Sequence, residues 1–120
     1  MRYYSKDHEW LYIVGDTGEV GITNHAQNQL GDIVFCEAEP PGTALAAGEA
    51  AGAVESVKAA SDILTPVSGE IIAVNPDPQR EPSLLNSAPE ETWVFRIRLS
   101  DPAELAGLLD EGAYSAFCDE

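Results

Sequence analysis

Short apolar segments separated by turn residues constrain the fold of this chain most strongly. They are rich in Val, Ile and aromatic residues, and Gly, Pro or Asp lies between them: HEWLYIV, EVGIT, DIVFCEAE, AGAVESV, GEIIAV and TWVFRIRLS. Segments of this length and composition are typical of β-strands. Thr23 or Asn24 can cap a short helix over HAQNQL that ends at Gly31, and Asp101 followed by Pro102 predicts a C-terminal helix. The sequence therefore predicts a mostly β fold with one short helix in its N-terminal half and one helix at its C-terminus.

The rest of the chain indicates no domain boundary. Residues 75–92 contain four prolines and few large apolar groups, so we expect a long irregular loop there. Gly112 is expected to separate the C-terminal helix from a last turn that contains Tyr114 and Phe117. Neither stretch separates two hydrophobic segments of domain size, and 120 residues suit a single core. We expect one domain over residues 1–120.

The charge balance excludes several classes of partner. Asp and Glu number 21 against six Lys and Arg, which gives a formal net charge of −15. Such a chain repels the nucleic-acid backbone and anionic membranes, and it favours partners with basic patches. No apolar run approaches the roughly 20 residues of a membrane-spanning helix, and MRYYSKDHEW does not resemble a signal peptide. We expect a cytoplasmic monomer that binds neither nucleic acid nor membranes.

The cysteines and histidines do not predict a reactive centre. Cys36 and Cys118 lie far apart without CxxC spacing, so we expect free thiols. Nothing in the sequence places His8 or His25 beside either thiol, and the spacing argues against a zinc site. No nucleophile–base pair is visible either. We therefore expect neither a metal centre nor an enzyme.

One lysine stands out from this background. The chain has only two lysines, Lys6 and Lys58, and Lys58 lies in ESVKAASD between two predicted strands. Glu55 precedes Lys58 by three residues and Asp62 follows it by four. Small neighbours at a hairpin tip would present the amine for acylation by another enzyme. A solvated lysine in a turn is the commoner case, and only the wider context favours a modification site.

That context is an ordered series of motifs. YSKDHEW, VGITNHAQNQLGDIVF, ESVKAASD, PVSGEI, AVN, PSLLN and DPAEL resemble successive blocks of the glycine cleavage H-protein family, over almost the whole chain. Biotinyl domains typically place Met on both sides of their lysine, whereas Val57 and Ala59 flank Lys58 here. Lipoyl domains of 2-oxoacid dehydrogenases usually read Asp-Lys-Ala and lack HEW and GITNHAQ. Both are poorer matches.

The resemblance implies a fold and a function. H-proteins are barrel-sandwich hybrids of two β-sheets and have no catalytic activity of their own. A lipoyl-modifying enzyme would join lipoate to Lys58 by an amide bond. The P-protein, a pyridoxal-phosphate decarboxylase, would load the arm with the aminomethyl group of glycine. The T-protein would pass the one-carbon unit to tetrahydrofolate, and the L-protein would reoxidise the dihydrolipoyl group.

The resemblance also implies roles for residues around Lys58. In the family the loaded arm folds into a cleft where acidic side chains hold its cationic amine, and the matching residues here are Glu9 and Asp62. Asp7 stands where a serine often occurs, which leaves that third contact open. Glu55 would help the modifying enzyme to recognise the turn. Gly69 would close the base of the hairpin by adopting a backbone conformation that other residues resist.

Two points remain open from the sequence. After PSLLN the family usually continues with Pro-Tyr and places Gly directly before Trp, whereas this chain reads SAPEETW. The turn before Trp93 must therefore be built differently, and this departure bears on partner docking there. The alternative function is an H-protein-like lipoate donor or relay carrier that is not engaged in glycine catabolism. An acidic binding module with an unmodified Lys58 is a third class.

Overall fold

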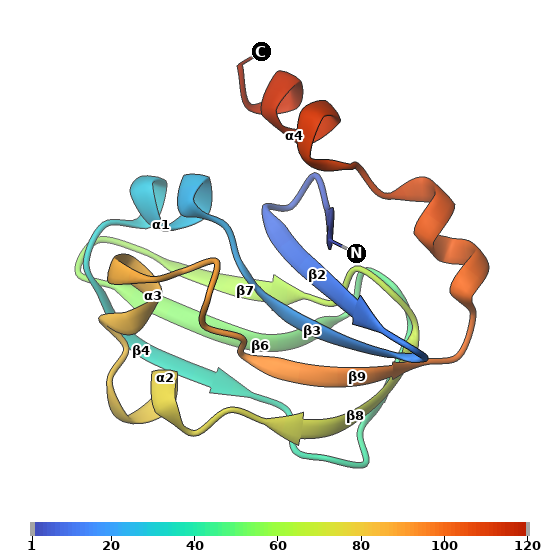
Figure 1. The fold of residues 1–120 in the computed structure, drawn as a ribbon. Coiled ribbons are helices and arrows are strands. Elements are labelled where there is room, and N and C mark those ends of the chain that lie inside the picture. The colour runs from blue at the N-terminus through green and yellow to red at the C-terminus, as the bar shows by residue number, and fades with distance from the viewer. Residues whose placement is uncertain (1, 120) are drawn as a thin grey trace.

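The computed structural model describes residues 2–119 as two antiparallel sheets with short helices (Figure 1). The elements, in chain order, are β1 (Arg2–Tyr4), β2 (Glu9–Val14), β3 (Thr17–Ile22), α1 (Asn24–Leu30), β4 (Ile33–Ala38), β5 (Ala44–Leu45), β6 (Ala50–Ser56), β7 (Ala60–Leu64), β8 (Gly69–Val74), α2 (Asp77–Arg80), α3 (Leu84–Ser87), β9 (Phe95–Leu99), the 3-10 helix η1 (Pro102–Gly107) and α4 (Glu111–Cys118). The larger sheet has the order β1-β2-β3-β9-β8-β5, and the smaller has the order β4-β6-β7.

The main core lies where the two sheets face each other. Strand alternation sends one side chain in two toward this core, as at Phe95, Ile97 and Leu99 of β9, whereas Arg96 and Arg98 point away. Among residues 2–119, the main core comprises fifteen buried residues drawn from both sheets and from the segments between them: Leu11, Val20, Ile22, Ile33, Cys36, Ala51, Val54, Ile63, Val67, Ile71, Leu85, Val94, Phe95, Ile97 and Leu99. The predicted mostly β fold of two sheets is confirmed, and neither sheet closes into a barrel.

A second, smaller cluster docks the C-terminal helix on the start of the chain. The aromatic cluster consists of three buried rings and the residues packed on them: Tyr4, Trp10 and Tyr114, with Trp93, Leu109, Phe117 and Cys118. The rings of Tyr4 and Tyr114 stack with centroids 4.7 Å apart. Leu109 exchanges two backbone hydrogen bonds of 2.8 Å with Tyr4, so the segment before α4 extends the edge of β1.

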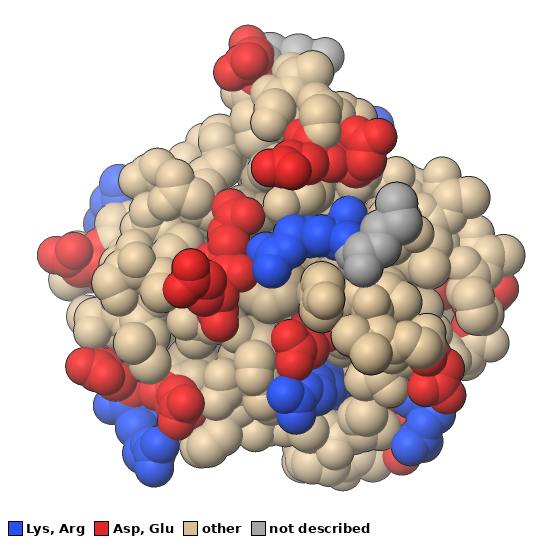
Figure 2. Space-filling model, viewed as in Figure 1, with Lys and Arg blue, Asp and Glu red and all other residues tan. Residues whose placement is uncertain are grey.

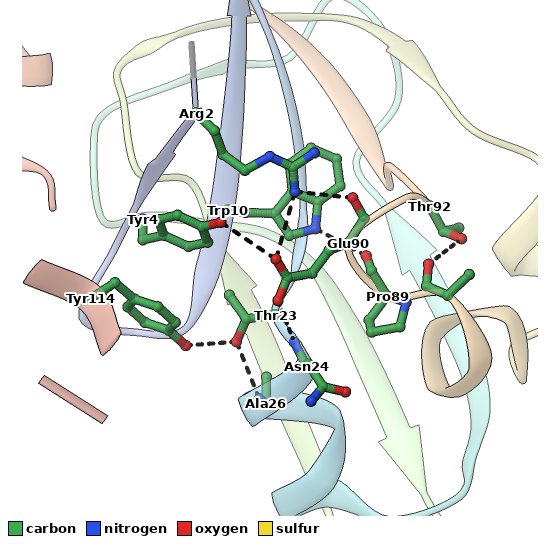
Figure 3. Close-up of polar contacts among 11 residues, drawn as sticks. Arg2, Tyr4, Trp10, Thr23, Asn24, Ala26, Pro89, Glu90, Thr92 and Tyr114 are labelled. Atoms are coloured by element: carbon green, nitrogen blue, oxygen red, sulfur yellow. Dashed lines mark hydrogen bonds and ion pairs between the residues drawn. The ribbon is translucent and has the colours of Figure 1, made fainter. Parts of the chain in front are cut away.

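The turn before Trp93 is held by polar contacts to the N-terminal half (Figure 3). The Glu90 carboxylate accepts hydrogen bonds from the Tyr4 hydroxyl at 3.4 Å and from the backbone N–H of Asn24 at 3.1 Å. Arg2 pairs with the same carboxylate and donates to the Glu90 carbonyl. The Trp10 indole N–H donates to the carbonyl of Pro89 at 3.0 Å. SAPEETW is therefore an ordered turn that positions the start of α1.

The helices differ from the sequence prediction in two places. Residues 75–92 are not one irregular loop, because α2 and α3 form within them, each four residues long. The predicted C-terminal helix is also divided, and its break is not at Gly112. It ends as η1 before Leu108, and α4 begins after Asp110, whose side chain accepts a hydrogen bond from the N–H of Ala113. Gly112 lies inside α4. The predicted short helix in the N-terminal half is confirmed as α1, with Thr23 as its cap.

The surface carries the charge imbalance of the sequence. Figure 2 shows acidic side chains spread over one face, with fewer basic groups among them. Within residues 2–119, no helix combines the length and the apolar character needed to cross a membrane.

Candidate functional site

Lys58 lies at the tip of the β6–β7 hairpin, and backbone contacts fix the shape of this tip. The N–H of Ser56 donates to the carbonyl of Ala59 at 2.7 Å and closes the turn. The Ser56 hydroxyl accepts from the N–H groups of Lys58 and Ala59, at 3.3 and 3.1 Å. The N–H of Val57 donates to the carbonyl of Asp32 at 3.0 Å, which fastens the tip to the segment before β4. The backbone is held in place while the Lys58 side chain is exposed.

The stem of Lys58 passes over the C-terminal end of α1. Gly31 ends α1 with φ of 81°, and a Cβ added there would lie 3.4 Å from Cε of Lys58. Asn86 in α3 holds this point, because its amide donates to the Gly31 carbonyl at 2.8 Å and accepts from the N–H of Ile33 at 2.9 Å. The sequence analysis missed the role of Asn86, although it singled out the PSLLN motif that contains it.

Glu9 is a buried carboxylate beside the free edge of β7. Its side chain accepts a hydrogen bond from the Ser5 hydroxyl at 2.7 Å and another from the N–H of Leu64 at 3.3 Å. Burial raises the pKa of Glu9 to about 7, with a smaller contribution from the negative charge of Asp7, while the two hydrogen bonds act in the opposite direction. The hydroxyl beside Glu9 therefore comes from Ser5, and Asp7 remains exposed.

Asp62 and Glu55 lie on the outer side of the same hairpin. Both are exposed and line one shallow hollow between β6 and β7. Asp62 of β7 pairs with Ala53 of β6, and Ala53 pairs on its other side with Glu37 of β4. Asp62 and Glu37 therefore flank Ala53 in one row across the sheet. Glu9 approaches β7 at Leu64, two residues beyond Asp62. Among the described contacts, none joins Glu9 directly to Asp62.

Gly69 serves a different purpose from the one expected. It begins β8 and does not occur among the described residues with positive φ, so its backbone conformation is open to other residues. A Cβ added to Gly69 would lie only 2.1 Å from the carbonyl oxygen of Arg98 on β9. The position requires glycine because the two strands approach closely there. It lies at the β8–β9 pairing and not at the base of the Lys58 hairpin.

The structure also brings together three side chains whose proximity the sequence did not predict. His8, His25 and Cys118 each offer a ligand atom, and these atoms all lie within 4.8 Å of one another. Nothing in the sequence places either histidine beside a thiol, whereas the structure places both of them near Cys118. The three residues come from the turn before β2, from α1 and from the end of α4, so their proximity depends on the docking of α4 and leaves no motif in the sequence.

Comparison with known proteins places this fold and its motifs in one family. The family model described as glycine cleavage H-protein matches residues 2–120. The chain belongs to the glycine cleavage H-protein family. The resemblance noted from the sequence motifs is thereby confirmed.

Individual H-proteins match over nearly their whole length. The glycine cleavage system H protein of Bradyrhizobium diazoefficiens is 54% identical over 114 residues, which cover 94% of this chain and 93% of that protein. The H protein of Thermotoga maritima is 48% identical, with 98% and 96% covered. The crystal structure of the H protein from Mycobacterium marinum superposes with a TM-score of 0.86 at 33% identity, and covers 96% of this chain and 94% of that one. This likeness confirms the expected H-protein architecture.

Proposed function

We propose that this chain is the lipoyl carrier of a glycine cleavage system, with lipoate joined by an amide bond to Nζ of Lys58. The loaded arm would take the aminomethyl group from the P-protein to the T-protein, and the L-protein would reoxidise the dihydrolipoyl group. The observation that carries the proposal is the exposed Lys58 at a firmly held hairpin tip in a chain that matches the H-protein family from residue 2 to residue 120. On this proposal the chain carries the reacting group and its partner enzymes perform the catalysis.

The hairpin tip suits a residue that another enzyme must reach. Its backbone is fixed by the hydrogen bonds of Ser56 and by the contact from Val57 to Asp32. The side chain of Val57 is 71% exposed beside Lys58, and this apolar surface is available for docking. A long arm on a held attachment point makes each transfer effectively intramolecular within a docked complex. Glu55, exposed three residues before Lys58, is our candidate for recognition by the modifying enzyme.

Glu9 and Asp62 are our candidates for holding the loaded arm. The aminomethyl group carries a cationic amine, and a cation close to Glu9 would favour the ionised carboxylate that burial disfavours. The Ser5 hydroxyl and the N–H of Leu64 orient that carboxylate. Because Asp62 lies two residues from Leu64 on β7, an arm that runs from the hairpin tip along this strand would pass Asp62 before Glu9.

The relatives favour glycine cleavage over the lipoate relay. Those of B. diazoefficiens and T. maritima are both named glycine cleavage system H proteins. We further propose that the chain acts as a monomeric, single-domain protein of the cytoplasm. One main core shared by both sheets supports the single domain.

Lipoylation is tested by mass spectrometry of protein produced with a lipoate ligase and lipoate. We expect one lipoyl adduct, which peptide mapping places on Lys58 and which Lys58→Arg abolishes. Lys6→Arg is the matched control and should keep the adduct. An adduct on Lys6, or none on the wild-type protein, would contradict the proposal.

The role of Glu9 is tested on the lipoylated, aminomethylated protein. Glu9→Gln keeps the size of the side chain and removes its charge. Loss of a sheltered charge-assisted hydrogen bond costs on the order of 1.5–3 kcal/mol, so the loaded form should decay roughly 10- to 100-fold faster. Reduction of the unloaded disulfide by the L-protein should not change. Asp16→Asn, in the exposed turn between β2 and β3, serves as control. Equal lifetimes of the loaded Glu9→Gln and wild-type proteins would remove Glu9 from the arm site.

A further inference from the structure

The cluster of His8, His25 and Cys118 has nearly the dimensions of a metal site. Its ligand atoms lie within 4.8 Å of one another, and all three residues are half-buried. In a tetrahedral zinc site, Zn–N distances of about 2.0–2.1 Å and a Zn–S distance of about 2.3 Å place the ligand atoms roughly 3.3–3.6 Å apart. The ligand atoms of this cluster would have to move about 1 Å closer together to reach the separations of a zinc site. Rotation of the side chains is the movement that would bring them closer.

One ring nitrogen of His8 has an outer partner of the kind that metal-binding histidines commonly use. Its Nδ1 lies 2.8 Å from the Tyr114 hydroxyl, which in turn lies 2.7 Å from Oγ1 of Thr23. When Tyr114 donates to Thr23, its oxygen can accept from Nδ1–H of His8, and Nε2 keeps its lone pair; this tautomer is assigned from the network. Histidines that bind metals commonly donate their second N–H to an outer partner in this way.

The backbone of His8 is also held in an unusual conformation. Its φ is 68°, in the left-handed region, and His8 is the single non-glycine residue in that region among residues 2–119. Backbone hydrogen bonds from His8 to Ser5 and from Thr23 to His8 maintain it. An L-residue adopts this conformation only at an energetic cost. The surroundings therefore fix the backbone from which the imidazole projects.

The His25 side chain is free to turn toward an ion, and the Cys118 thiol lies within hydrogen-bonding range of the Tyr114 hydroxyl. The His25 ring stacks on His8 with centroids 4.3 Å apart, and within residues 2–119 it makes no hydrogen bond. Cys118 is a free thiol at the end of α4. The net charge of −15 favours the approach of a cation. Two imidazoles and a thiolate are borderline-to-soft donors that suit zinc, whereas Mg²⁺ and Ca²⁺ prefer oxygen.

We propose that His8, His25 and Cys118 bind one zinc ion, with the fourth position open to water. The ion would link the turn before β2, the helix α1 and the helix α4. It would thereby fasten the C-terminal helix to the N-terminal half of the protein. The site does not include Lys58, so it stands independently of the lipoyl-carrier proposal.

The test is a cobalt titration of the metal-free, unlipoylated full chain with a reductant that does not bind metals. Co²⁺ reports on zinc-type sites through its visible absorption and a thiolate-to-metal charge-transfer band. We expect one equivalent to bind with that band and Zn²⁺ to displace it, while a large excess of Mg²⁺ does not. Zinc should also raise the melting temperature, because an ion that binds only the folded state stabilises it.

Variants identify the ligands. Cys118→Ser should abolish the charge-transfer band, and His25→Ala should weaken Zn²⁺ binding at least tenfold, with circular dichroism confirming that both fold. Cys36→Ala removes the other thiol, which is buried in the main core, and should leave the band and the affinity unchanged. Lys58→Arg should also bind normally. Absence of the band in the wild-type protein, or equal zinc affinity in wild type and His25→Ala, would overturn the proposal.

Discussion

The main core and the aromatic cluster differ in the kind of side chain that they bury. The main core consists of aliphatic side chains with Phe95 and the thiol of Cys36, and strand alternation places most of them there. In the aromatic cluster each buried ring carries a polar tip that bonds to a distant segment: Tyr4 to Glu90, Trp10 to Pro89, and Tyr114 to Thr23 and His8. The main core thus determines the two sheets. The aromatic cluster determines which turns meet beside Glu9.

The largest effect should come from truncation in the main core. Phe95 is fully buried, so Phe95→Ala should lower the free energy of unfolding by about 3–5 kcal/mol, through lost burial and a cavity. Urea denaturation followed by circular dichroism measures this loss. Phe35 is 42% exposed, and Phe35→Ala is the matched control, with a loss below about 1 kcal/mol. Equal losses would mean that the main core does not dominate stability.

Alkaline pH should reveal the apolar character of the main core. Burial, and to a lesser degree the charge of Glu37, raises the pKa of Cys36 from 9.0 to about 11. The fold thus favours the neutral thiol, and its contribution is complete below pH 9 and is lost as the pH rises from 9 through 11. A shift of about two pKa units corresponds to at most about 2.7 kcal/mol.

The comparison between wild type and Cys36→Ala isolates this contribution. The difference in free energy of unfolding between the two proteins should shrink by most of that amount between pH 8 and pH 11, as measured by urea denaturation at each pH. Parallel pH profiles for the two proteins would show that the Cys36 thiol ionises alike in the folded and unfolded chains.

Loss of one hydroxyl should loosen the aromatic cluster locally. Tyr114→Phe keeps the ring and leaves Thr23, which is fully buried, and His8 without that partner. We expect a loss of about 1–2 kcal/mol, and hydrogen exchange should increase in α4 and the turn before β2 but not in β6 or β9. Tyr12→Phe, at an exposed ring, is the control. Uniform acceleration across both sheets would show that the two clusters unfold as one unit.

The smallest effect should be at the hairpin tip, which belongs to neither cluster. Lys58 is exposed, so Lys58→Ala should change the free energy of unfolding by no more than about 0.5 kcal/mol, like Lys6→Ala. Thermal and urea denaturation of the unlipoylated proteins measure this. A loss of several kcal/mol would assign Lys58 a structural role that its exposure does not support.

The comparison also explains what the sequence could predict. The strands of the main core follow from local apolar patterns, and the turn at Lys58 follows from small residues between two such strands. The helices α2 and α3 could not be predicted, because four residues span about one helical turn and show no periodicity.

Contacts between distant segments account for the rest of the candidate site. The burial of Glu9 depends on Ser5 and on the edge of β7, more than fifty residues away. The need for glycine at position 69 comes from its approach to Arg98, and a sequence gives no sign of such a contact. The meeting of His8 with Cys118 depends in the same way on how α4 docks.

The pairing of Leu109 with Tyr4 bears on aggregation. An exposed edge strand offers unpaired N–H and C=O groups to other molecules, and this is a common route to edge-to-edge association and fibril growth. Here β1 is the outer strand of the six-stranded sheet, and the chain itself occupies its hydrogen-bonding groups at Tyr4 through two bonds of 2.8 Å. The opposite outer strand, β5, is only two residues long. The larger sheet therefore offers little template at either edge, so crowded copies of the protein have little chance to join through this sheet.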